Sequence, residues 1–104
     1  MDDLFKRTQA EFHQGGGDFL TMELAICSRY AHLASTMYMA GKASFADRQI
    51  ADAEESYATA HRFMKDPKNS QHLTIKTVQE STKKLEALRE KLDQLQRSRN
   101  QTNP

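Results

Sequence analysis

The longest stretch without a helix breaker, from Ser70 to Ser98, constrains the fold most. It contains no glycine or proline, and apolar residues recur every three or four positions on one side, which is the period of an amphipathic α-helix. The first half of that side is partly polar, and the second half is a leucine seam of Leu85, Leu88, Leu92 and Leu95. The stretch predicts one helix over about residues 70–98, with Asn69 or Ser70 as its N-cap.

Residues 18–40 predict a second helix. It begins at Asp18, a residue type that caps first turns, and it ends before Gly41, which can adopt the left-handed conformation that follows many helices. Apolar side chains occupy more than half of its circumference at about 100° per residue. Such a helix needs neighbours on several sides, so we expect it at the centre of the fold.

Residues 44–65 predict a third helix, which begins with a capping box at Ser44 and Asp47 and ends before Pro67. Its apolar seam alternates small and large side chains, which allows a neighbouring helix to approach closely. The seam consists of Ala46, Ile50, Ala53, Tyr57, Ala60 and Met64.

The two ends of the chain are predicted separately. Residues 1–14 predict a short helix with Leu4, Phe5, Thr8 and Phe12 on one face, and Gly15–Gly17 follow as a joint. Residues 99–104 predict a frayed tail.

These segments predict an all-α fold. The 104 residues suit one domain, and no run alternates with the period of a β-strand. Short connections make neighbouring helices antiparallel. We therefore expect an antiparallel three-helix bundle of residues 18–98, an additional short N-terminal helix over residues 1–14, and a long C-terminal helix that overhangs the bundle.

The overhang provides the first candidate site. From Ser70 the long helix would span about 42 Å, against about 33 Å for each partner helix. On this geometry the apolar surface at Leu88, Leu92 and Leu95 extends past its neighbours. We expect these leucines to contact another protein or a second copy of the chain.

Glu23 is the one acidic residue near the middle of the apolar arc of residues 18–40. A buried carboxylate must be paired, hydrogen-bonded or protonated. The sequence allows two interpretations: a structural ion pair at the mouth of the bundle, or an acid that anchors a small ligand inside it.

Metal, cofactor and catalytic motifs are missing from the sequence. His13, His32, His61 and His72 lie in different segments, and none forms a Glu-x-x-His or His-x-x-x-His pair. Cys27 is the only cysteine and has no histidine at a predictable position beside it. We expect no enzyme activity and no cofactor.

The distribution of charge gives only weak support for the alternative that the protein binds nucleic acid. The chain has fifteen Lys and Arg residues and fourteen Asp and Glu residues, so its net charge is +1. The whole molecule therefore has no strong electrostatic field. The basic side chains of residues 83–99 alternate with acidic ones, and we expect i,i+4 pairs such as Glu80–Lys84 and Asp93–Arg97.

The spacing Ala53-x-x-x-Tyr57-x-x-Ala60 resembles the second helix of a tetratricopeptide repeat, in which two helices pack closely through small residues. The resemblance covers about 14 residues. Pro67 comes later than such a repeat would place it, and the Leu-Gly-x-x-Tyr of a first repeat helix is missing, so only a repeat-like hairpin is expected.

The leading function hypothesis is a non-enzymatic helical module for protein–protein interaction or oligomerisation. The alternatives are a small-ligand-binding bundle with Glu23 at its site and a helical protein that associates weakly with nucleic acid. A lone cysteine and an acidic start favour the cytoplasm, and the charges inside the most apolar segment disfavour a membrane span.

Overall fold

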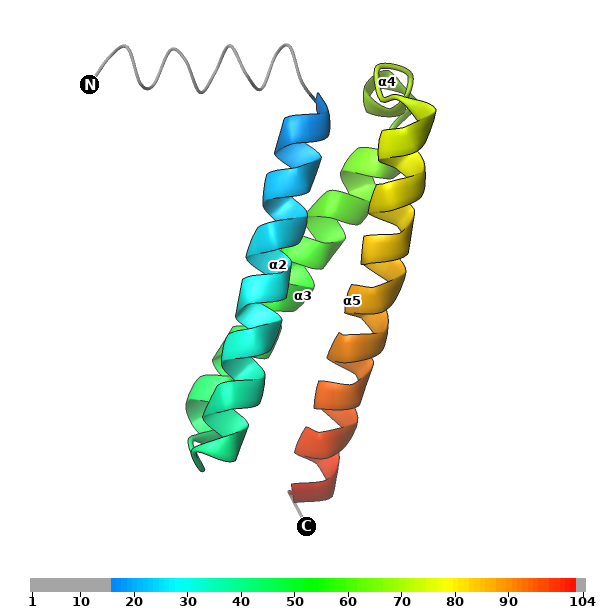
Figure 1. Cartoon of the computed structure of the whole chain (residues 1–104). Coiled ribbons are helices and arrows are strands. Elements are labelled where there is room, and N and C mark those ends of the chain that lie inside the picture. Colours follow the sequence, from blue (N-terminus) through cyan, green and yellow to red (C-terminus); the bar gives the residue numbers. More distant parts are fainter. Residues whose placement is uncertain (1–15, 103–104) are drawn as a thin grey trace, which may run out of the picture.

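A computed structural model describes residues 16–102 of the chain, and these residues form a helical bundle without strands. The elements are α2 (Gly16–Met39), α3 (Ala43–Lys65), the short α4 (Pro67–Ser70) and α5 (Ile75–Thr102). The three long helices run alternately down, up and down (Figure 1). The predicted antiparallel three-helix bundle is therefore confirmed, and the N-terminal helix predicted over residues 1–14 lies outside the described residues.

The connection between α2 and α3 is a tight turn. Gly41 has a φ of 76°, the left-handed conformation that favours glycine, as predicted. The predicted capping box is wrong: α3 begins at Ala43, and no side chain caps its first turn. The Asp47 carboxylate instead accepts a hydrogen bond of 2.8 Å from the Tyr38 hydroxyl and ties the end of α2 to α3.

The segment between α3 and α5 also differs from the prediction. Asp66 caps α4 by accepting a hydrogen bond from the backbone N–H of Lys68. The long helix then starts at Ile75, because the Thr74 hydroxyl accepts from the N–H of Thr77 at 3.1 Å and so fixes the first turn. It continues to Thr102, so the tail predicted from residue 99 is helical as far as the structure describes it.

Small side chains bring α2 and α3 closest together in the bundle. Buried alanines on both helices leave room for the backbones, and Ile50 of α3 and Cys27 of α2 fill the space between them. The α3 seam predicted from sequence is confirmed at its four buried positions. The whole buried apolar core is Leu20, Leu24, Cys27, Ala31, Ala34, Ala46, Ile50, Ala53, Ala60, Leu85, Leu92 and Leu95.

The C-terminal leucines lie inside this core, so the prediction that they lack internal partners is wrong. Leu92 is 0% exposed and Leu95 is 6% exposed, and Leu88 packs half-buried against the same cluster. The reason is the later start of α5. From Ile75, Leu95 lies about 30 Å along the helix, within the length of about 36 Å that 24-residue α2 provides.

Leu92→Ala tests this placement. Removal of a fully buried leucine side chain should lower the free energy of unfolding by about 2–5 kcal/mol, measured by urea denaturation. Ile75→Ala is the control, because Ile75 is 78% exposed and its truncation should change stability by less than about 0.5 kcal/mol. Equal effects of the two substitutions would contradict a core position for Leu92.

Candidate functional site

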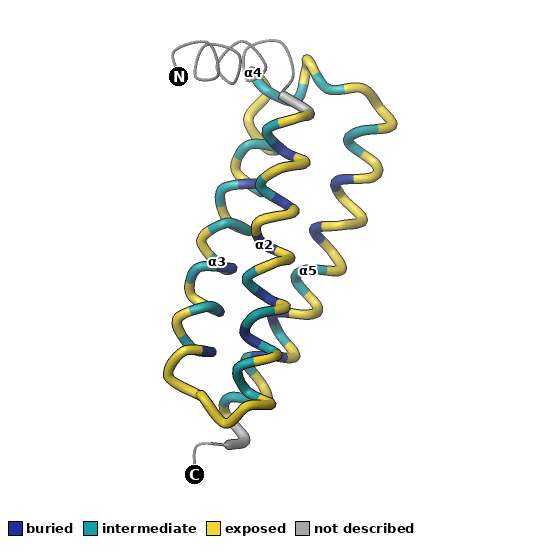
Figure 2. Tube along the Cα trace, turned by 60° about the vertical axis from the view of Figure 1, so that its left-hand side comes forward, coloured by how far each residue is buried: buried dark blue, intermediate teal, exposed yellow. Residues whose placement is uncertain are grey.

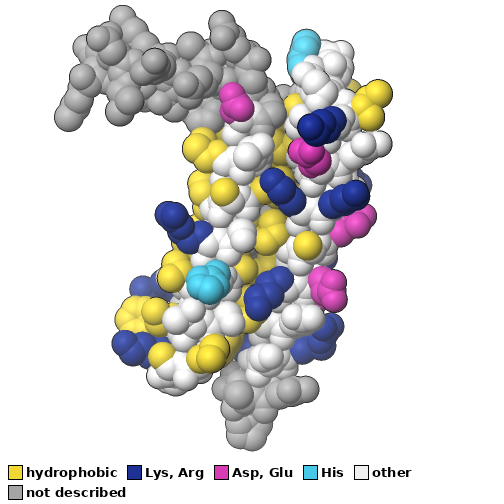
Figure 3. Space-filling view, viewed as in Figure 1, with side chains coloured by type: hydrophobic (Ala, Val, Ile, Leu, Met, Phe, Trp, Pro, Cys, Tyr) yellow, Lys and Arg dark blue, Asp and Glu magenta, His cyan; other side chains and the backbone are white. Residues whose placement is uncertain are grey.

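One side of α2 is covered by neither α3 nor α5 among the described residues and carries exposed apolar side chains. α3 and α5 pack on two sides of α2, and exposed residues recur along its remaining side (Figure 2). Met22 is 45% exposed and Ile26 is 38% exposed. Tyr30 and Leu33 follow at helical spacing and are half-buried. In the space-filling view, hydrophobic side chains line the outer margin of α2 (Figure 3).

The signal for this surface was present in the sequence. The apolar arc of α2 is wider than two neighbours can cover, so the prediction that the whole arc is buried at the centre of the bundle is wrong. The described part of the chain supplies only α3 and α5 as long neighbours. The excess of the arc therefore remains at the surface. Apolar side chains that lie next to one another at a surface make a candidate interaction site. The row of Met22, Ile26, Tyr30 and Leu33 is called the α2 strip.

Beside this strip, α2 and α3 enclose an open groove with a volume of about 240 Å³. Ile26 and Tyr30 of α2 form its apolar part. Its remaining lining is polar and mostly acidic and consists of Glu23, Asp52, Glu55, Ser56 and Thr59. One end of the α2–α3 pair is fixed by Phe19 and Phe63, whose ring centroids lie 5.0 Å apart.

Glu23 therefore occupies a different place from the one predicted. It is half-buried at the edge of an open groove, not buried within the core. The apolar arc misled the prediction because its α3-facing edge is accessible between the two helices. The groove is smaller than the volume of about 300–1,000 Å³ that ligand pockets usually have. A small-ligand site at Glu23 would lack the enclosure that such sites use.

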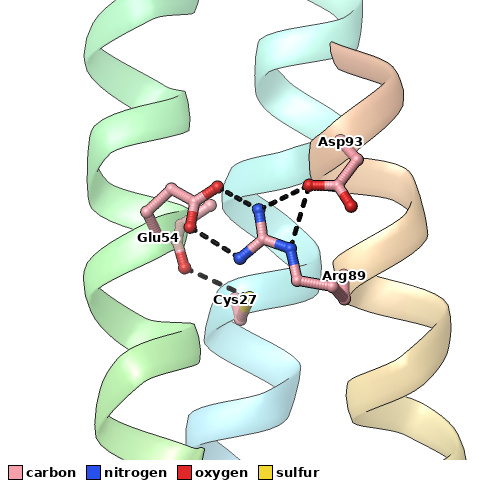
Figure 4. A network of polar contacts seen from close by, with 5 residues as sticks. Cys27, Glu54, Arg89 and Asp93 are labelled. Carbon is pink, nitrogen blue, oxygen red and sulfur yellow. Dashed lines mark hydrogen bonds and ion pairs between the residues drawn. The ribbon is translucent and has the colours of Figure 1, made fainter. Parts of the chain in front are cut away.

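A polar network centred on Arg89 holds α5 against α3 (Figure 4). The guanidinium donates two hydrogen bonds to the Glu54 carboxylate, one of them at 2.9 Å, and its Nε donates to Asp93 at 3.0 Å. Its centre also lies 4.9 Å from the centroid of the Tyr57 ring. The bidentate bond to Glu54 raises the pKa of Arg89 further above its ordinary value. These contacts of the guanidinium are all with side chains of the bundle, so the network joins α5 to α3.

Arg89→Gln should destabilise the bundle without changing its shape. Glu54 and Arg89 keep 30% and 34% of their side chains exposed, so the loss should be about 1–2 kcal/mol, below the cost of breaking a fully buried pair. Urea denaturation measures this loss. Arg97→Gln removes an exposed cation without an ion pair among the described residues. We expect this control to leave the free energy of unfolding unchanged. If Arg89→Gln also left the free energy of unfolding unchanged, the network would not stabilise the contact of α3 with α5.

Cys27 lies below this network and is 0% exposed. Its thiol donates to the backbone carbonyl of Ala53 at 3.3 Å. Burial, together with the nearby Glu54 carboxylate, raises the pKa of Cys27 to about 11. A protonated, inaccessible thiol is a poor nucleophile. The residue acts as a small side chain in the α2–α3 contact.

The remaining predicted sites are not brought together. His32, His61 and His72 lie in three different segments, and His13 is outside the described residues. Within residues 16–102, no group of three His, Cys, Asp or Glu side chains could hold a metal ion. None of the described helices is both long and apolar enough to cross a membrane.

The ion pairs on α5 differ from those predicted. Glu80 lies 4.0 Å from Lys76 and not beside Lys84, and Asp93 contacts Arg89 in place of Arg97. Sequence spacing allows a carboxylate to pair toward either end of its helix, so it could not decide between them. Weak association with nucleic acid through the basic side chains of α5 that make no ion pair stays a prediction.

Comparison of the sequence with protein-family models and curated proteins, and of the fold with solved structures, found no match. The site is therefore interpreted from its own geometry.

Proposed function

We propose that the protein is a non-enzymatic helical module that binds another protein through the uncovered side of α2. The observation that carries this proposal is the exposure of Met22 and Ile26 on a helix whose buried apolar residues pack in the core. The contact surface moves from Leu88, Leu92 and Leu95, which pack within the bundle, to this strip.

The exposed apolar side chains of the strip can contribute binding free energy when a partner buries them. Full burial of a Met or Ile side chain contributes about 1.5–3 kcal/mol, and Met22 and Ile26 are still 45% and 38% exposed. Their burial against a partner would thus contribute about 1–2 kcal/mol together, with further gain from the half-buried Tyr30 and Leu33. The rigid bundle behind the strip limits the entropy lost on binding.

The double variant Met22→Glu/Ile26→Glu tests the proposal. It should leave the free energy of unfolding nearly unchanged, because both side chains are already exposed, and it should abolish the interaction. The measurement combines quantitative affinity capture from the native cells with light scattering of the purified protein. Captured proteins, or a second copy, should be present for the wild type and lost for the variant.

Ala51→Glu/Ala58→Glu is the matched control. It adds the same charge at two exposed positions of α3, and it should retain the interaction. A wild type that is strictly monomeric and captures no protein would overturn the proposal, as would capture that the double variant leaves intact.

A further inference from the structure

The groove beside the α2 strip carries carboxylates without counter-ions. Glu23, Asp52 and Glu55 all line it, and none of their carboxylates makes an ion pair or hydrogen bond with any described residue. Arg48 lies one turn from Asp52 on α3 but does not pair with it. By contrast, the carboxylates of α3 that face α5 are paired, Glu54 with Arg89 and Asp47 with Arg99. On α3 the unpaired acids therefore lie on the side away from α5, while Glu86 and Glu90 of α5 are also unpaired.

The apolar part of the same face is a row of side chains beside the groove, and the exposed Arg29 lies in the same row. Met22, Ile26 and Leu33 repeat along α2 with helical spacing, and α3 forms the opposite wall of the groove. The side chains of a third helix can insert between two such rows. The groove follows residues 23–30 of α2 and 52–59 of α3, which is about 11 Å or two turns of each helix.

We propose that this face binds a basic amphipathic helix of another protein. The apolar side of that helix would cover Met22 and Ile26, and its Lys or Arg side chains would meet Glu23, Asp52 and Glu55. The inference rests on the proposed function and adds the chemical class of the partner. The bound helix would lie on the side of the α2–α3 pair opposite to α5 and complete a four-helix arrangement.

A second copy of the chain fits this face less well. A two-fold dimer presents the same patch from both copies, so the three unpaired carboxylates of each copy would enter one interface together. Like charges brought into a partly desolvated interface repel one another. A partner with basic flanks removes this repulsion and supplies the missing counter-ions.

Two synthetic helical peptides provide the probe. Both carry leucines at the same core positions over three heptads, and their flanking positions are all Lys in one peptide and all Glu in the other. Titration into the full-length, isotope-labelled protein, followed by NMR of the backbone amides, gives both affinity and location. The Lys peptide should bind more tightly and should shift the amides around Ile26 and Asp52, with little change along α5.

Charge variants test whether the Lys peptide responds to the carboxylates of the groove or only to the net charge of the protein. Glu23→Gln/Asp52→Asn/Glu55→Gln should weaken binding of the Lys peptide about three- to tenfold, as expected for three partly exposed ion pairs. Glu80→Gln/Glu86→Gln/Glu90→Gln makes the same change in net charge on α5 and should alter binding less than about twofold, because salt screens distant charges.

The outcomes distinguish this inference from the proposed function. If both peptides bind the α2–α3 face equally and Met22→Glu/Ile26→Glu abolishes both, the interaction surface stands and the basic partner is overturned. Equal weakening by the two charge variants, or shifts confined to α5, also overturns it. A wild-type dimer that Met22→Glu/Ile26→Glu dissociates would identify a second copy as the occupant and would contradict the proposal.

Discussion

The close contact of α2 with α3 is the constraint on which the rest of the structure depends. Alanines at 31, 34, 46, 53 and 60 are all buried, so the two backbones approach without large side chains between them. The thiol of Cys27 fits the same contact and donates to the carbonyl of Ala53. α5 then supplies the larger side chains of the core, among them Leu85 and Leu92, and Arg89 fixes its position against α3.

This arrangement determines which surfaces remain available. Once the buried residues of α2 pack against α3 and α5, part of its apolar arc is left over, and Met22 and Ile26 reach the surface. The same packing places the unpaired Glu23, Asp52 and Glu55 along the edge of that part of the arc. The apolar strip and its acidic border thus have one origin, an α2 whose apolar arc is wider than two helices can cover.

Periodicity was sufficient to predict the three long helices, the α3 seam and the antiparallel bundle, because these depend on local spacing and short connections. It placed the start of α5 five residues too early, since Ser70 and Thr74 are both acceptable caps and only Thr74 caps that helix in the fold. That error moved Leu92 and Leu95 beyond their partners. Glu23 was misplaced for a related reason: an apolar arc shows which residues prefer burial but not how many neighbours will cover them.

The central claim is that the uncovered apolar surface lies on α2 and not at the end of α5. Methyl NMR with a soluble paramagnetic agent in the solvent measures this directly in the free protein. The account predicts strong relaxation of the Met22 and Ile26 methyl groups and weak relaxation of those of Leu92 and Leu95. Strong relaxation of the two leucines, together with protection of Met22 and Ile26, would contradict it.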